Sequence, residues 1–323
     1  MKKAYKVTST IEKMDHNKII QDFYEKLGAK GYKGKIVSAK YIPELQNSIK
    51  KFHDQKLIDT DFYEEYKTYF EFQPKAEFGE IKSLFIITVP QPQYKVTFHW
   101  NKKEVPLIIP PTYLHGKDVI KMTKAFLTEI LKPSGYNVEF ARVPQKTLAV
   151  RVGLAEYGRN NITYVPDMGS FHRPSTFYSD FPYDQDDWKD LRMMDLCQEC
   201  SACVRKCPTG AIPTDRFLLR VEKCLTYHNE HPEDVPFPDW IDPSWHNCLV
   251  GCMCCQKVCP ANKKMMNWVE AGPTFSEEET KLLVSGVSIE NLPEKTRKKL
   301  EEHDLINYLY VYPRNLEAIL KRF

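Results

Sequence analysis

The first 196 residues of this 323-residue chain contain no cysteine, and all ten cysteines lie between Cys197 and Cys259. A disulfide framework would distribute its bridges across the fold. A dense local set is instead typical of metal ligands in a reducing compartment. The sequence therefore predicts a metal-binding segment that follows a larger cysteine-free region.

The chain also lacks a long apolar run and an excess of charge of one sign. Its longest apolar run, 84–89, is far shorter than the roughly 20 residues of a membrane-spanning helix. The N-terminus has basic residues but no apolar segment behind them and no twin-arginine pair, so we expect a cytoplasmic protein without membrane contact. With 46 basic and 43 acidic residues, the net charge of +3 predicts no strong binding to nucleic acid.

Apolar periodicity in the first part of the chain predicts helices that alternate with a strand. An apolar, β-branched strand at 83–91 precedes helical spacing over 119–131, which indicates an α/β or α+β layer architecture. The acidic stretch 182–190 reads as a linker, and short polar helices are predicted after Ser276. We therefore expect three domains, at residues 1–190, 191–265 and 266–323.

The first cysteine group has the spacing of a bacterial two-cluster ferredoxin, C-x2-C-x2-C-x3-C-P. Its members are Cys197, Cys200, Cys203 and Cys207, followed by Pro208. In this motif three thiolates bind one [4Fe–4S] cluster and the fourth binds the other. Zinc sites instead use CxxC pairs and need no four-cysteine run that ends in proline. One motif of this kind therefore predicts two clusters.

The second cysteine group repeats the spacing at Cys252, Cys255 and Cys259, but Leu249 stands where its first cysteine should be. Crossed ligation predicts a first cluster, called cluster A, bound by Cys197, Cys200, Cys203 and Cys259. The second cluster, called cluster B, takes Cys207, Cys252 and Cys255. Its fourth ligand is one of three candidates, Cys224, Cys248 or Cys254. We favour Cys224, because Cys248 is one residue out of register and Cys254 adjoins Cys255.

The block 138–184, followed by CQECSACVRKCPTGAI, VEKCLTY and GCMCCQKVCPAN, resembles epoxyqueuosine reductase and, more distantly, the corrinoid-dependent reductive dehalogenases. The resemblance covers about residues 80–265. It implies an α+β protein with a nitroreductase-like α/β domain that binds cobalamin, a ferredoxin-like domain with two [4Fe–4S] clusters, and here a short helical tail. It also places Cys224 at the lone cluster cysteine of that family.

The resemblance further implies a corrin-binding loop and a proton donor. Glu139 occupies the position of the family's proton-donating aspartate, and a carboxyl group beside a corrin could donate a proton. Tyr157 and Tyr164 are alternative phenolic donors, and Arg173 resembles a dehalogenase arginine that could steer an anion. The implied loop residues are Gly153, Gly158, Arg159, Asn160, Thr163, Tyr164, Val165, Gly169 and Ser170.

The combined features predict a cobalamin-dependent reductase that takes electrons from a ferredoxin-type or flavodoxin-type donor and reduces a small organic molecule. The tRNA enzyme that the chain resembles continues into helical repeats, where this chain has a short tail, so we expect weak tRNA binding at most. Two alternatives stay open. The chain could activate the corrinoid of a partner enzyme, or it could be a flavin-binding nitroreductase-like enzyme with a ferredoxin module.

Overall fold

The computed structural model describes residues 2–73, 77–185 and 187–323, with side chains from residue 16 onward. It has a mixed α+β fold, as the sequence predicts. At its centre lies a four-stranded antiparallel sheet. Its strands, in spatial order, are β1 (Lys33–Ser38), β2 (Ser83–Pro90), β8 (His172–Ser179) and β5 (Val138–Phe140).

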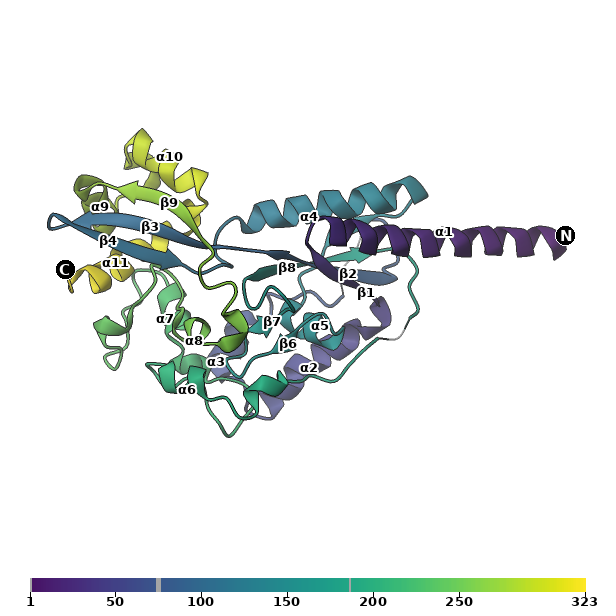
Figure 1. Cartoon of the computed structure of the whole chain (residues 1–323), viewed down its shortest axis with the longest axis horizontal. Helices are drawn as coiled ribbons and strands as arrows, with labels where there is room; N and C mark the ends of the chain where they lie inside the picture. Colours follow the sequence, from purple (N-terminus) through teal and green to yellow (C-terminus); the bar gives the residue numbers. More distant parts are fainter. Residues whose placement is uncertain (1, 74–76, 186) are drawn as a thin grey trace.

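Strand β2 is the predicted apolar strand, and its alternating side chains feed two separate cores. Phe85 and Ile87 belong to the core on one face, and Leu84 and Ile86 belong to the core on the other. The helices α1 (Lys2–Ala29) and α4 (Gly116–Leu131) cover the first face (Figure 1). The opposite face is covered by α2 (Ile42–Asp54) and α5 (Gln145–Arg151), and α3 (Thr60–Tyr66) and a short hairpin, β6 (Glu156–Tyr157) and β7 (Thr163–Tyr164), lie on the same side.

A second sheet joins the C-terminal part of the chain to the first part. Its order is β4 (Lys103–Ile109), β3 (Gln93–Trp100) and β9 (Val269–Phe275), with β9 parallel to β3. The helices packed around it are α9 (Glu277–Val284), α10 (Glu294–Glu302) and α11 (Tyr312–Leu320). Val96, Phe275 and Leu316 share one core. Residues 266–323 therefore contain a strand as well as helices, and they pack as one unit with the β3–β4 hairpin.

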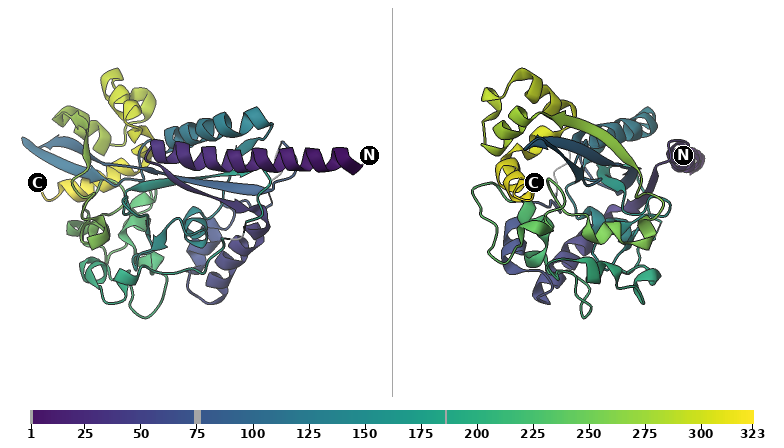
Figure 2. Two further views of the ribbon diagram at one scale, coloured as in Figure 1. Left: turned by 45° about the vertical axis from the view of Figure 1, so that its right-hand side comes forward. Right: turned by 60° about the vertical axis from the view of Figure 1, so that its left-hand side comes forward.

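The cysteine segment, residues 191–265, consists mainly of loops and three short α-helices. It lies below both sheets (Figures 1 and 2). These helices are α6 (Ala202–Lys206), α7 (Leu225–Glu230) and α8 (Cys254–Lys257). Among the described residues, no helix has both the length and the apolar character that a membrane span requires. The segment thus lies where the two sheets meet, against the β6–β7 hairpin.

Candidate iron–sulfur site

Four thiols line a small cavity between the β6–β7 hairpin and the cysteine segment. They belong to Cys197, Cys200, Cys203 and Cys259, the crossed set that the motif predicts for cluster A. Across the described ranges, no three Cys, His, Asp or Glu side chains converge closely enough to hold a single metal ion. A [4Fe–4S] cluster in this cavity would take one thiolate from each of the four cysteines.

A second group of thiols gathers beside this cavity. Burial raises the pKa of Cys224 and of Cys255, and the nearby Cys252 thiol raises both pKa values further. The Cys203 thiol also raises the pKa of Cys255, so the two groups of thiols adjoin. Three predicted ligands of cluster B are therefore close together. Cys207 follows α6, and its thiol lies 3.4 Å from Thr209 Oγ1.

The two remaining cysteines differ in their surroundings. Cys248 is fully buried and packs with Phe171 and Met253, and its backbone forms a bridge with Ile108 in β4. Cys254 is only partly buried, and a hydrogen bond from the Cys252 thiol lowers its pKa. The identity of the fourth ligand of cluster B stays a prediction, with Cys224 placed beside the other two.

Four of the residues assigned to the corrin-binding loop line the same cavity as the thiols of cluster A. They are Gly158, Arg159, Asn160 and Tyr164. Arg159 donates a hydrogen bond of 2.6 Å to the carbonyl oxygen of Cys197. Asn160 Nδ2 donates to the Tyr164 hydroxyl at 3.0 Å, and burial raises the pKa of that hydroxyl. Arg159 and Tyr164 therefore lie against two of the predicted ligands of cluster A, Cys197 and Cys259.

The turn at Gly169 and Ser170, between β7 and β8, holds the cysteine segment against the first part of the chain. The Ser170 N–H donates to Asn262 Oδ1 at 2.8 Å, and its hydroxyl donates to Gln256 Oε1 at 2.8 Å. Gly169 has a φ of +56°, and a side chain there would overlap Asn262 Oδ1. This turn therefore docks two parts of the protein.

The other predicted contacts with the corrin lie elsewhere. Thr163 and Val165 are buried, and Gly153 adopts a φ of +67° against the side chain of Lys189. The structure brings four of the nine loop residues to the thiol cavity and two to the docking turn. As contacts with a corrin, all nine stay a prediction.

The two charged candidates, Glu139 and Arg173, lie on the central sheet. Glu139 is on the edge strand β5, where its carboxylate accepts a 3.0 Å hydrogen bond from the N–H of Glu77. Arg173, near the start of β8, donates a hydrogen bond to the carbonyl oxygen of Thr112. Neither residue belongs to the lining of the thiol cavity.

Sequence reasoning missed a polar group beside Cys224 and Cys255. Much of the Lys146 side chain is accessible, but the protein atoms around its amine desolvate it and lower its pKa. The carboxylate of Glu230, at the end of α7, is close to this amine and accepts a hydrogen bond from the Tyr113 hydroxyl. Burial raises the pKa of Glu230 and of Tyr113. No spacing in the sequence links these three positions, because only the tertiary fold brings them together.

Residues 196–262 match the family described as the 4Fe-4S double cluster binding domain. Among curated proteins, the chain is 28% identical over 270 residues to an epoxyqueuosine reductase from Cyclobacterium marinum. That alignment covers 79% of this chain and 81% of the relative. The chain is an oxidoreductase similar to epoxyqueuosine reductase. A second such enzyme, from Cellulophaga algicola, is 30% identical over 156 residues, which cover 46% of this chain and 47% of the relative.

Solved structures of epoxyqueuosine reductases share the fold of this epoxyqueuosine reductase-like chain. The Bacillus subtilis enzyme matches with a TM-score of 0.65 and 18% identity, over 94% of this chain and 81% of its own. An epoxyqueuosine reductase bound to a modified tRNA stem loop matches with the same TM-score and coverage at 16% identity. The solved structures thus support the α+β fold, and the family match supports the double-cluster segment.

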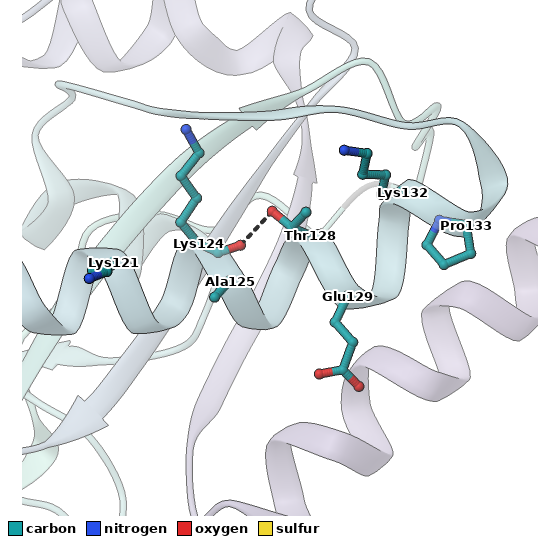
Figure 3. Close-up of a pocket in the computed structure, with 7 residues that line it drawn as sticks. All are labelled: Lys121, Lys124, Ala125, Thr128, Glu129, Lys132 and Pro133. Atoms are coloured by element: carbon teal, nitrogen blue, oxygen red, sulfur yellow. Dashed lines mark hydrogen bonds between the residues drawn. The ribbon is translucent and has the colours of Figure 1, made fainter.

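A further pocket of this epoxyqueuosine reductase-like protein lies on the outer face of α4 (Figure 3). It is lined by Lys121, Lys124, Ala125, Thr128, Glu129, Lys132 and Pro133. Helix α4 and the cysteine segment lie on opposite sides of the four-stranded sheet (Figure 1). The pocket contains no cysteine and takes no part in the iron–sulfur site.

Proposed function

We propose that the chain is a cobalamin-dependent iron–sulfur reductase in which clusters A and B pass electrons to a corrinoid that reduces an organic substrate. The observation that carries the proposal is the adjacency of the two thiol groups. Four thiols line one cavity, and Cys224, Cys252 and Cys255 gather beside it. Clusters bound by these neighbouring thiols would be close enough to exchange single electrons in sequence. The similarity to epoxyqueuosine reductases supports the corrinoid.

We place the cofactor and the substrate beside cluster B, where Lys146, Glu230 and Tyr113 form a polar group. Lys146 is accessible to solvent, although its amine lies close to Cys224 and Cys255. Glu230 and Tyr113 complete a chain of groups that can hold or move a proton. A bound corrinoid would supply a strongly nucleophilic metal centre. The protein would orient the substrate with Lys146 and limit the access of water.

We assign the transferred proton to Glu139, although the carboxylate here accepts from the N–H of Glu77. The Bacillus subtilis epoxyqueuosine reductase was captured with its catalytic aspartate loop swung out of the active site. We propose that Glu139, which precedes the loop leading to α5, undergoes an equivalent movement. The Tyr113–Glu230 pair is the second candidate, because it already lies beside Lys146.

A small organic molecule is the proposed substrate, and the near balance of basic and acidic residues supports it. A modified tRNA is the second candidate. One observation favours it: the epoxyqueuosine reductase solved with a tRNA stem loop matches this chain over 81% of its own length. The proposed electron donor is a low-potential protein of the ferredoxin or flavodoxin type.

Absorbance titration of the anaerobically reconstituted protein tests the proposed cofactor. We expect added cobalamin to bind in the base-off form, because the loop 153–170 has no histidine to coordinate cobalt. Tight binding of FMN with no response to cobalamin would instead support a flavin enzyme. Cluster absorption with no response to either compound would support an electron-transfer protein.

A further inference from the structure

Asn247 places its side-chain amide against two thiols of the second cysteine group. Its Nδ2 atom lies 3.3 Å from Cys252 Sγ and 3.3 Å from Cys254 Sγ. Both distances are suitable for N–H···S hydrogen bonds. Because Cys252 is a proposed ligand of cluster B, the amide would donate to a thiolate that is bound to iron.

Three further contacts fix the orientation of this amide. Asn247 Oδ1 accepts a 3.0 Å hydrogen bond from the N–H of Met253 and a 3.2 Å hydrogen bond from the Cys248 thiol. Nδ2 also donates to the carbonyl oxygen of Trp245 at 3.0 Å, which leaves its second hydrogen to point at the sulfur atoms. A backbone N–H can only donate, so the amide oxygen must face Met253, and the NH2 group must face the sulfur atoms.

The same contacts give Cys248 a role that needs no iron. Its buried thiol donates to the acceptor end of Asn247, while the donor end faces Cys252. Phe171 and Met253 pack around this thiol, so its position is fixed. The cysteine that stands one residue out of the ferredoxin register therefore anchors the amide.

We propose that Asn247 is a positioning residue that raises the reduction potential of cluster B by donating an N–H···S hydrogen bond to Cys252. The proposal rests on the cluster assignment given under the proposed function. Reduction adds negative charge to the cluster and its sulfur atoms, and a nearby N–H stabilises that charge. Of the hydrogen bonds that Asn247 makes with described residues, none reaches a cysteine of cluster A. Cluster A is therefore an internal reference in the same molecule.

Redox titration followed by EPR, on the anaerobically reconstituted full chain, tests the proposal. Asn247→Leu removes the donor, and Asn247→Asp keeps an acceptor for Met253 while placing a negative charge beside Cys252. We expect one midpoint potential to fall in both variants, further in Asn247→Asp, while the other midpoint stays unchanged. The matched control is Cys248→Ser, which keeps a hydroxyl donor to Asn247 and should leave both midpoints unchanged.

Unchanged midpoints in both Asn247 variants, with all iron retained, would overturn the proposal. So would equal shifts of both midpoints, because the amide contacts only one of the two sets of ligands. If both variants lose the iron of one cluster, Asn247 is required for assembly and the tuning role is wrong. Wild-type protein that holds fewer than two clusters would refute the cluster assignment itself, and iron analysis distinguishes that failure from the others.

Discussion

At the scale of single residues, the ten cysteines differ in their burial and their partners, and these differences predict which of them bind iron. Cys224 lies beside Cys252, whereas Cys248 is enclosed by apolar side chains and bonds to Asn247. We expect Cys224→Ser to lose the iron of one cluster, and Cys248→Ser and Cys254→Ser to retain both clusters. Iron analysis and EPR of the reconstituted variants measure this. Loss in Cys248→Ser with retention in Cys224→Ser would reverse the choice of ligand.

The proton donor is a second question at the residue scale. Burial raises the pKa of Tyr157 to about 12, and Tyr164 lines the thiol cavity, so neither phenol is well placed to donate a proton to a substrate. We expect Glu139→Gln to keep both clusters and to lower turnover roughly 10²–10⁴-fold, the range for loss of a general acid. Glu139→Asp should recover part of the activity. Unchanged turnover in Glu139→Gln, together with a large loss in Tyr113→Phe, would assign the role to the Tyr113–Glu230 pair.

At the scale of elements, the turn at Gly169–Ser170, between β7 and β8, packs against the cysteine segment. We expect Gly169→Ala to destabilise the protein, because the residue has a positive φ and the added methyl group would overlap Asn262 Oδ1. Gly31→Ala is the matched control, since Gly31 has a φ of +67° and no atom within 4 Å of the added carbon. The control should cost only about 1–2 kcal/mol of backbone strain. Chemical unfolding measures both variants, and an equal loss would show that the contact with Asn262 is unimportant.

The elements also show which parts of the fold can be predicted from local sequence. The apolar run of β2 and the helical spacing of α4 are local patterns, and so is the capping box that Ser276 and Glu279 form at the start of α9. Strand β9 was missed because most of its residues are exposed, and its pairing partner β3 is distant in sequence. The polar group of Lys146, Glu230 and Tyr113 was also missed, because its members are distant in sequence and only the tertiary fold brings them together. The spacing of the two cysteine motifs predicts that Cys197, Cys200, Cys203 and Cys259 come together, and these four residues line one cavity. Their role as ligands of cluster A stays a prediction.

At the scale of the whole molecule, charge bears on the choice between a small substrate and tRNA. The chain carries 46 basic and 43 acidic residues, and phosphate contacts dominate the affinity for nucleic acids. We expect weak, salt-sensitive binding of tRNA at most, as measured by titration of a labelled stem loop at two salt concentrations. Conversion of epoxyqueuosine-containing tRNA to queuosine, with cobalamin and a strong reductant supplied, would contradict this and give the chain the activity of its relatives.

At this scale we infer that one segment, where the two sheets meet, carries two [4Fe–4S] clusters. Iron and sulfide analysis with Mössbauer spectroscopy of the anaerobically reconstituted full chain tests this claim most directly. The two motifs predict about eight iron atoms per chain, all in [4Fe–4S] clusters. Stoichiometric zinc with no iron, or four iron atoms that no reconstitution increases, would contradict it.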